Sequence, residues 1–135
     1  MSRVAILDDE KSVRTLMGVY LKRSGHSILQ CESPESVIER FREFHGEIDL
    51  LVADVGLGAD SGVEIGLQLM GWSPKLKLLL ISGYPFTAWS IRDAALFLEL
   101  RPESVRVLQK PFTLLDMLVK VDQLIGPALT SAAAG

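Results

Sequence analysis

The sequence predicts an α/β domain built on a doubly wound parallel sheet, and three observations carry that prediction. Five short apolar runs, typical of strands buried on both faces, alternate with segments whose apolar residues repeat at helical spacing. Strands joined by helices run parallel, with right-handed crossovers that place helices on both faces of the sheet. The length of 135 residues suits one domain with one core.

The strands and the first two helices can be placed in chain order. The predicted strands are Arg3–Leu7, Ser27–Cys31, Ile48–Ala53, Leu76–Ile81 and Val105–Gln109. The first helix follows from apolar residues at helical spacing between Val13 and Leu21, with Gly25 at the position of a C-terminal glycine. The second helix begins with Ser33 as N-cap and Pro34 at the first helical position.

Three further helical patterns complete the alternation. A weak pattern spans Gly62–Met70, and a longer one spans Ala88–Leu100. The last helix begins with Thr113 as N-cap and Asp116 three residues later, and its apolar residues up to Ile125 face one way. The chain therefore reads as a strand followed by a helix, five times over.

Composition narrows the class of function. A net charge of −3 without a run of Lys or Arg argues against non-specific nucleic-acid binding. The single cysteine, Cys31, is expected as a small buried residue at a strand end, in a reducing compartment. No apolar run approaches the ~18 residues of a membrane span, so we expect a cytoplasmic protein with no membrane partner. His26 and His45 fall near helix ends and are expected on the solvated surface.

Polar side chains stand at four of the five strand ends: Asp8 and Asp9, Asp54, Ser82, and Lys110. Open parallel sheets bind ligands at the carboxyl ends of their strands, so we expect these groups to converge. Three close carboxylates do not all stay ionised cheaply without a cation, and Mg²⁺ prefers oxygen ligands and leaves positions open for phosphoryl oxygens. The pattern predicts a phosphoryl-transfer site with a cationic lysine, a serine donor and a carboxylate able to act as nucleophile.

Four segments at these strand ends resemble one known family. The segments "LDDE" (Leu7–Glu10), "ADVGLGADSG" (Ala53–Gly62), "ISGY" (Ile81–Tyr84) and "LQKPF" (Leu108–Phe112) are similar to the receiver domain of bacterial two-component response regulators. The resemblance implies a flavodoxin-like (βα)5 fold with a five-stranded parallel sheet of order 2-1-3-4-5. It makes residues 1–125 a receiver domain and 126–135 a flexible tail or linker stub.

The resemblance also implies roles for the acidic residues. Asp54 would be the phosphoacceptor, taking a phosphoryl group from a phosphohistidine. Asp9, Asp54 and the backbone carbonyl of Gly56 would ligate Mg²⁺ directly, while Asp8 would act through a bound water.

Four other positions match the family pattern. Lys110 would pair with the phosphoryl oxygens, and Ser82 would move to hydrogen-bond one of them. The Lys110–Pro111 bond is cis in this family, an isomer that only an X-Pro bond adopts readily. Gly62 matches the loop glycine before the third helix.

The chain departs from the family pattern near Asp54 and at the position on the fifth strand whose side chain moves on activation in many receivers. Gly56 has no side chain to position an attacking water, and Tyr84 would cover the site instead. Leu57 and Gly58 replace a common Met-Pro pair. Val107 stands where many receivers have a mobile aromatic ring, and a stiff β-branched side chain does not swing in that way.

The fourth helix is apolar almost all round, in a segment that is longer than usual for the family. Its predicted inward stripe is Ile91, Ala94, Ala95 and Leu98. The remaining apolar residues either meet a partner or pack under the loop at Arg101–Ser104: Phe86, Trp89, Leu96, Phe97 and Leu100. The predicted switch or partner surface consists of Ser82, Tyr84, Trp89, Phe97 and Val107. A homodimer through the fourth helix and fifth strand would use this surface.

The predicted function is therefore a phosphoacceptor module of a two-component phosphorelay. Its partner would be a histidine kinase or a histidine phosphotransfer domain, and this chain would bind no nucleic acid. It would not be an enzyme, except in promoting its own phosphorylation and dephosphorylation. Two alternatives are a phosphorylation-independent scaffold and a small Mg²⁺-dependent aspartyl phosphatase. Gly56 argues against the phosphatase, which usually has a second Asp at that position.

Overall fold

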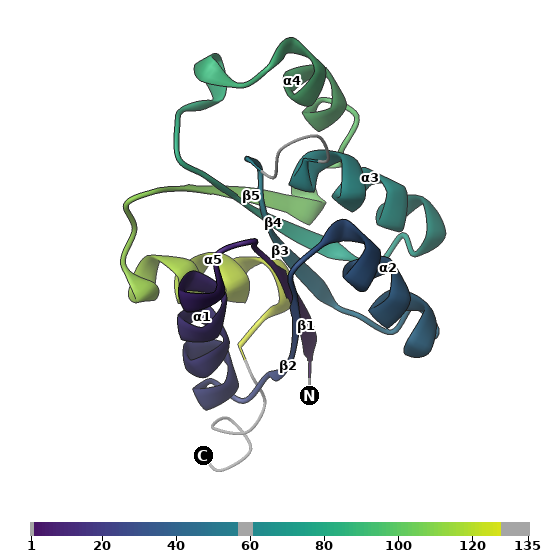
Figure 1. Cartoon of the computed structure of the whole chain (residues 1–135), viewed down its shortest axis with the longest axis vertical. Coiled ribbons are helices and arrows are strands. Elements are labelled where there is room, and N and C mark those ends of the chain that lie inside the picture. The colour runs from purple at the N-terminus through teal and green to yellow at the C-terminus, as the bar shows by residue number, and fades with distance from the viewer. Residues whose placement is uncertain (1, 57–60, 128–135) are drawn as a thin grey trace.

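A five-stranded parallel sheet forms the centre of the molecule (Figure 1). The computed structural model describes residues 2–56 and 61–127. The strands are β1 (Arg3–Leu7), β2 (Ser27–Cys31), β3 (Leu50–Asp54), β4 (Lys77–Ser82) and β5 (Val105–Gln109). All neighbouring strands pair in parallel, in the order β2-β1-β3-β4-β5. The predicted doubly wound fold is confirmed, as is the strand order that the resemblance implies.

Local signals in the sequence set the helix boundaries. The described residues form α1 (Lys11–Arg23), α2 (Pro34–Glu43), α3 (Gly62–Trp72), α4 (Ile91–Phe97) and α5 (Leu114–Ile125), with 3₁₀ turns η1 (Phe86–Ala88) and η2 (Pro102–Ser104). Ser33 caps α2 by accepting the Ser36 N–H at 3.2 Å. Thr113 and Asp116 form the predicted reciprocal cap of α5, at 3.0 and 3.1 Å. Gly25, just beyond α1, has φ of 96°, which glycine adopts without strain.

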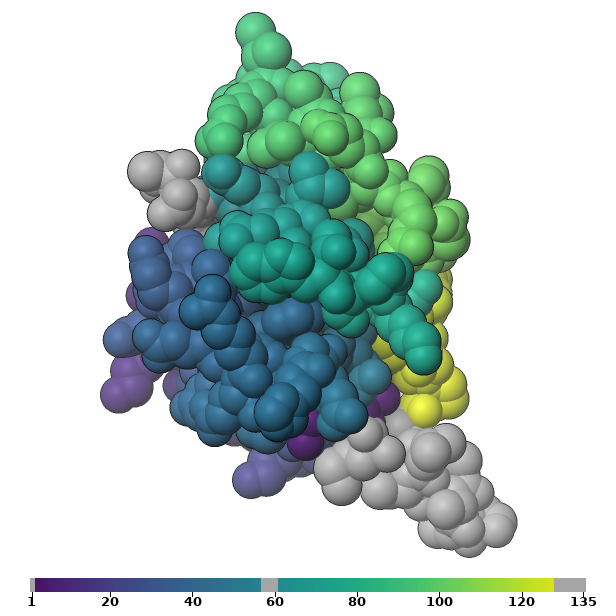
Figure 2. All heavy atoms as spheres, turned by 90° about the vertical axis from the view of Figure 1, so that its right-hand side faces the viewer, coloured from purple at the N-terminus to yellow at the C-terminus, as the bar shows by residue number. Residues whose placement is uncertain are grey.

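Helices cover both faces of the sheet, so alternate strand residues enter two separate cores. On one face, Ile6, Val52 and Leu79 pack with α1 and α5. On the other, Ala53 and Leu80 pack with α2, α3 and the segment around α4. Figure 2 shows α2, α3 and this last segment, in blue, teal and green, side by side on the second face. Burial on both faces explains why the strands read as continuous apolar runs.

The fourth helix differs from its sequence prediction. It has only seven residues instead of the predicted thirteen between 88 and 100, because the chain enters and leaves through turns. The predicted inward stripe is wrong: Ile91 is 90% exposed and Leu98 is 77% exposed. Trp89 and Leu100, which flank the helix, are buried in the core instead. The core beneath this segment is therefore closed by these flanking residues, while the Ile91 and Leu98 side chains lie in solvent.

Several other expectations concern single segments. Cys31 is buried, as predicted, and burial raises the pKa of its thiol. Leu57 and Gly58 lie outside the described residues, and so does the predicted tail beyond residue 127. No helix in the described part of the chain combines the length and the apolar character needed to cross a membrane.

His26 is not on the solvated surface, where the sequence placed it. The side chain is buried, and neither ring nitrogen has a hydrogen-bond partner. It precedes β2, whose first residues are half-buried at the edge of the sheet. Burial lowers the pKa of His26, and the carboxylates of Asp122 and Asp49 oppose this only in part. The imidazole therefore folds in its neutral form.

This neutral histidine predicts a loss of stability in mild acid. Below about pH 6.5 the unfolded chain takes up a proton on His26 that the folded protein does not bind, so the free energy of unfolding falls. The loss at pH 5.5 is at most roughly 1 kcal/mol, for a histidine that stays neutral when folded. Urea unfolding at pH 7.5 and 5.5 measures the loss, and His26→Leu removes this contribution.

The matched control is His45→Asn, which replaces an exposed histidine whose φ is 55° by a residue that tolerates that conformation. This variant is expected to keep the pH dependence of the parent protein. Equal pH dependence in the parent and in His26→Leu would contradict the assignment.

Candidate functional site

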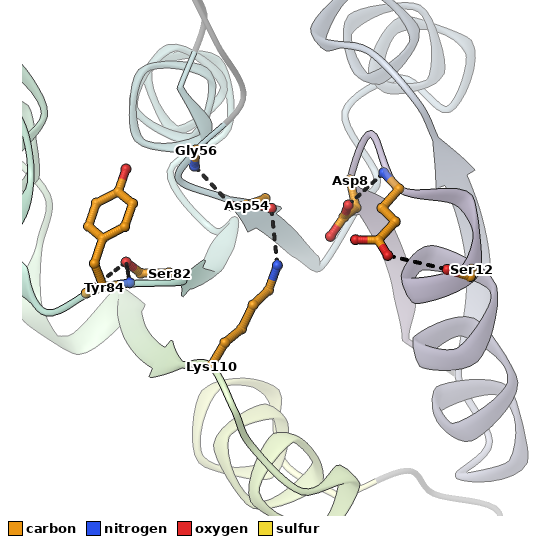
Figure 3. Close-up of polar contacts among 8 residues, drawn as sticks. Asp8, Ser12, Asp54, Gly56, Ser82, Tyr84 and Lys110 are labelled. Atoms are coloured by element: carbon orange, nitrogen blue, oxygen red, sulfur yellow. Dashed lines mark hydrogen bonds and ion pairs between the residues drawn. The ribbon is translucent and has the colours of Figure 1, made fainter.

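Three carboxylates converge at the carboxyl edge of the sheet. β1 and β3 are neighbours, with Leu7 paired to Ala53, so the residues that follow them emerge side by side. One oxygen from each of Asp8, Asp9 and Asp54 lies within 4.8 Å of the others. Figure 3 shows Asp8 and Asp54 facing each other from the two strands. The predicted convergence of the acidic residues is therefore present.

Asp8 is the most constrained of the three carboxylates. Its side chain is only 1% exposed. Oδ1 accepts the Glu10 N–H at 2.8 Å, whereas the buried Oδ2 has no hydrogen-bond partner. Burial raises the pKa of Asp8, and the charges of Asp54 and Asp9 raise it further, against the Glu10 N–H and the charge of Lys110. An unpaired oxygen in a crowded acidic site is a donor set that fits a hard divalent cation.

Asp54 is held by contacts to both of its oxygens. Oδ1 accepts the Gly56 N–H at 2.9 Å. Oδ2 lies 3.4 Å from Nζ of Lys110, which reaches across from the loop after β5 (Figure 3). This ion pair is longer than a strong charge-assisted hydrogen bond, which spans about 2.7–2.9 Å. Asp54 therefore has a cationic neighbour but no short, strong hydrogen bond to it. The Lys110–Pro111 peptide is cis, as the resemblance implies.

Ser82 lies on the neighbouring strand, but its hydroxyl is engaged elsewhere. It donates to the backbone carbonyl of Tyr84 and accepts the Tyr84 N–H at 3.2 Å and the Trp89 indole N–H at 3.1 Å. In Figure 3 the Ser82 hydroxyl points toward Tyr84. The Tyr84 phenol oxygen lies 3.9 Å from the point that a Cβ on Gly56 would occupy. Tyr84 thus stands over the missing side chain of Gly56, close to Asp54.

The predicted switch surface divides into exposed and buried residues. Tyr84 is exposed, and Phe97 and Val107 are half-buried against the core beneath α4. Trp89 is only 7% exposed, so it offers almost no area to a partner. Its role is internal, because its indole bonds to Ser82.

Two contacts near the site were not anticipated. Arg14 in α1 is buried and donates from Nη1 to the backbone carbonyl of Asp8 at 2.7 Å, which fixes the end of β1. The only signal for it was a charged residue next to the apolar positions of that helix. The bond from Trp89 to Ser82 joins residues seven apart across an irregular turn, and no periodic pattern predicts such a contact.

Comparisons with known proteins identify the family of this chain. The family model described as the response regulator receiver domain matches residues 4–122. The response regulator receiver protein CpdR of Brucella abortus is 24% identical over 93% of this chain and 98% of its own length. The sensor kinase CckA of the same organism is 26% identical over 90% of this chain, which spans only 12% of CckA.

A solved structure supports the same fold. A receiver domain protein from Clostridium thermocellum superposes with a TM-score of 0.77 at 21% identity, covering 93% of this chain and 94% of that one. The chain described here belongs to the response regulator receiver domain family.

Gly62 sets the distance between α3 and the end of β3. A Cβ on Gly62 would lie 2.6 Å from the Asp54 carbonyl oxygen and 2.8 Å from the Ala53 Cβ. Both atoms belong to a buried strand end that cannot yield as a flexible side chain does. The glycine therefore allows the helix to begin directly against the end of β3.

Gly62→Ala is predicted to destabilise the fold by about 1–3 kcal/mol, the usual cost of overpacking. The matched control is Gly71→Ala in the same helix, where an added Cβ meets nothing within 4 Å. That variant is expected to be neutral or to stabilise by up to about 1 kcal/mol, through helix propensity. Denaturant midpoints compare the two variants. Equal midpoints would refute the close-approach argument.

Proposed function

We propose that this receiver domain accepts a phosphoryl group on Asp54 from the phosphohistidine of a histidine kinase or a histidine phosphotransfer domain. The observation that carries the proposal is the position of Asp54 between Nζ of Lys110, at 3.4 Å, and the carboxylates of Asp8 and Asp9. The Lys110 ammonium can neutralise the oxygens of a transferring phosphoryl group, and the carboxylates of Asp8 and Asp9 can hold a cation. The relative CckA is a sensor kinase, which supports a partner of that class.

The transfer is a single displacement at phosphorus. A carboxylate oxygen of Asp54 attacks the phosphorus, an O–P bond forms and the N–P bond of the phosphohistidine breaks. The electron pair of the broken bond stays on the imidazole nitrogen of the donor, which takes up a proton. The Lys110 ammonium stabilises the charge on the phosphoryl oxygens, and the Gly56 N–H keeps the acceptor carboxylate oriented.

The acidic residues would hold Mg²⁺. Asp9, Asp54 and the Gly56 carbonyl would bind it directly and Asp8 through a water; when bound, the ion neutralises these carboxylates and the incoming phosphoryl oxygens. The fit rests on the unpaired Oδ2 of Asp8 and on the 4.8 Å cluster. The same proposal includes a cytoplasmic location, and activity limited to the chain's own phosphorylation and dephosphorylation.

A partner surface around α4 also belongs to the proposal. Ile91 and Leu98 expose large apolar side chains there, close in sequence to the exposed Tyr84. A homodimer through α4 and β5 would cover such residues.

Incubation with acetyl phosphate and Mg²⁺, followed by intact mass measurement, tests the function. The protein is expected to gain one base-labile phosphoryl group, and Asp54→Ala to gain none. Asp122→Asn, an exposed carboxylate on α5, is the matched control and keeps the gain. Release of phosphate from many substrates with turnover would favour a phosphatase instead. A parent protein without any mass shift would favour a phosphorylation-independent scaffold.

Lys110→Ala is expected to lower the initial rate of this labelling by more than about tenfold, because it removes the cation beside the acceptor. Stability changes by about 1 kcal/mol or less, since the pair with Asp54 is partly exposed. Rates come from intact mass against time, and stability from urea unfolding. An unchanged rate in a folded variant would remove Lys110 from the proposed mechanism.

A further inference from the structure

The Ser82 hydroxyl is fully used in the structure, although it stands next to the acceptor. Its side chain is 1% exposed and makes three hydrogen bonds, to the Tyr84 carbonyl, the Tyr84 N–H and the Trp89 indole N–H. Its single proton goes to the Tyr84 carbonyl. This hydroxyl has no proton left to donate to another acceptor in that position.

Strand pairing places Ser82 beside the reacting carboxylate. Asp54 pairs with Ile81, the residue before Ser82, and the Lys110 N–H donates to the Ser82 carbonyl at 2.8 Å. Ser82 therefore lies between the strand of the acceptor and the loop of the lysine. A phosphoryl group on Asp54 would bring three terminal oxygens to this edge, within reach of a hydroxyl that turned toward them.

Trp89 is the hydrogen-bond donor to the Ser82 hydroxyl, and its ring belongs to an aromatic cluster. Its indole donates to Ser82 Oγ at 3.1 Å, and its ring packs against Phe86 at 5.0 Å and Phe97 at 5.4 Å between centroids. Phe86 and Phe97 also pack against each other, at 5.3 Å. The three rings connect η1 with α4, so a displacement of the indole is transmitted to the exposed side of this segment, where Phe86 is 42% exposed.

We propose that Trp89 is a positioning residue that holds the Ser82 hydroxyl away from Asp54. We call the buried position of Trp89, with its indole bonded to Ser82, the seated position. Phosphorylation of Asp54 and the seated position of Trp89 then exclude each other. A change of Ser82 rotamer moves Oγ by about 2 Å, which breaks the bond to the indole unless the ring follows. A buried indole N–H left without a partner is costly, so the ring repacks against Phe86 and Phe97. This inference rests on the proposed function of Asp54.

This mechanism couples the site at Asp54 to the α4 segment without an aromatic side chain on β5. Val107 is stiff and half-buried, whereas the indole already joins the site to the α4 segment. Because coupling between two sites is reciprocal, a partner that holds Trp89 in its seated position would oppose phosphorylation, and one that displaces it would favour phosphorylation.

Fluorescence of Trp89 tests the inference without altering that residue. The chain has two tryptophans, and Trp72→Phe leaves Trp89 as the only one, with Trp72 half-exposed at the far end of α3. Mg²⁺ with beryllofluoride, a phosphoryl mimic, is expected to produce a saturable change in emission beyond that of Mg²⁺ alone. The same titration in Trp72→Phe/Ser82→Ala is expected to show no beryllofluoride-dependent change, because the coupling hydroxyl is absent.

A double-mutant cycle provides a second readout. Trp89→Phe keeps an aromatic ring, although a smaller one, and removes the N–H. It is expected to raise the initial rate of labelling by acetyl phosphate about 2- to 10-fold, the factor of one net hydrogen bond. In the Ser82→Ala background the same substitution is expected to leave the rate unchanged. If Trp89→Phe lowers the labelling rate equally in the parent and in the Ser82→Ala background, the positioning role is overturned.

The outcomes separate this inference from the function it rests on. If the parent gains no phosphoryl group, both proposals fail. If the parent is labelled on Asp54 but Trp89 emission does not respond to beryllofluoride, only the role of Trp89 fails. A response that persists without the Ser82 hydroxyl would likewise refute the coupling while leaving phosphoryl acceptance intact.

Discussion

The repulsion among three carboxylates at one sheet edge is the constraint on which the rest of the site depends. Parallel pairing of β1 with β3 makes it unavoidable, since acidic residues directly follow β1 and end β3. Asp8 bears most of the cost, because it is buried with one oxygen unpaired and its pKa is raised. Lys110 offsets part of this charge from the opposite side. The negative charge that Lys110 does not offset makes this edge of the sheet suited to a cation and, through the cation, to phosphoryl oxygens.

The fold supplies the rigidity that such a cluster requires. Two apolar cores clamp the sheet from both faces, so the carboxyl ends of the strands have little freedom to move apart. Close contacts reinforce this at the two strand ends: Gly62 lets α3 begin against the carbonyl of Asp54, and buried Arg14 holds the carbonyl of Asp8. The Asp54 carboxylate itself is held less tightly, between one N–H and one long ion pair. Such an arrangement combines fixed neighbours with a carboxylate that no short ion pair holds in place.

The segment between β4 and β5 is where this receiver differs from the family pattern. Val107 lacks the ring expected on β5, and the chain instead folds Trp89 inward from an irregular turn so that it touches Ser82. Burying Trp89 and Leu100 leaves Ile91 and Leu98 exposed on a short helix. The same rearrangement therefore brings an aromatic cluster to the site and an apolar surface to the outside, which links the two in one element.

The sequence alone determined the parallel α/β fold, the helix caps at Ser33 and Thr113, and the set of acidic residues and lysine at the strand ends. These follow from local periodicity, cap chemistry and the rule that parallel strands share an edge. The family resemblance added the strand order. Only the tertiary structure decided the burial of His26, the inversion of the α4 faces and the bond from Trp89 to Ser82. Each of these depends on how non-periodic turns fill space against a distant element, which short-range patterns in the chain do not encode.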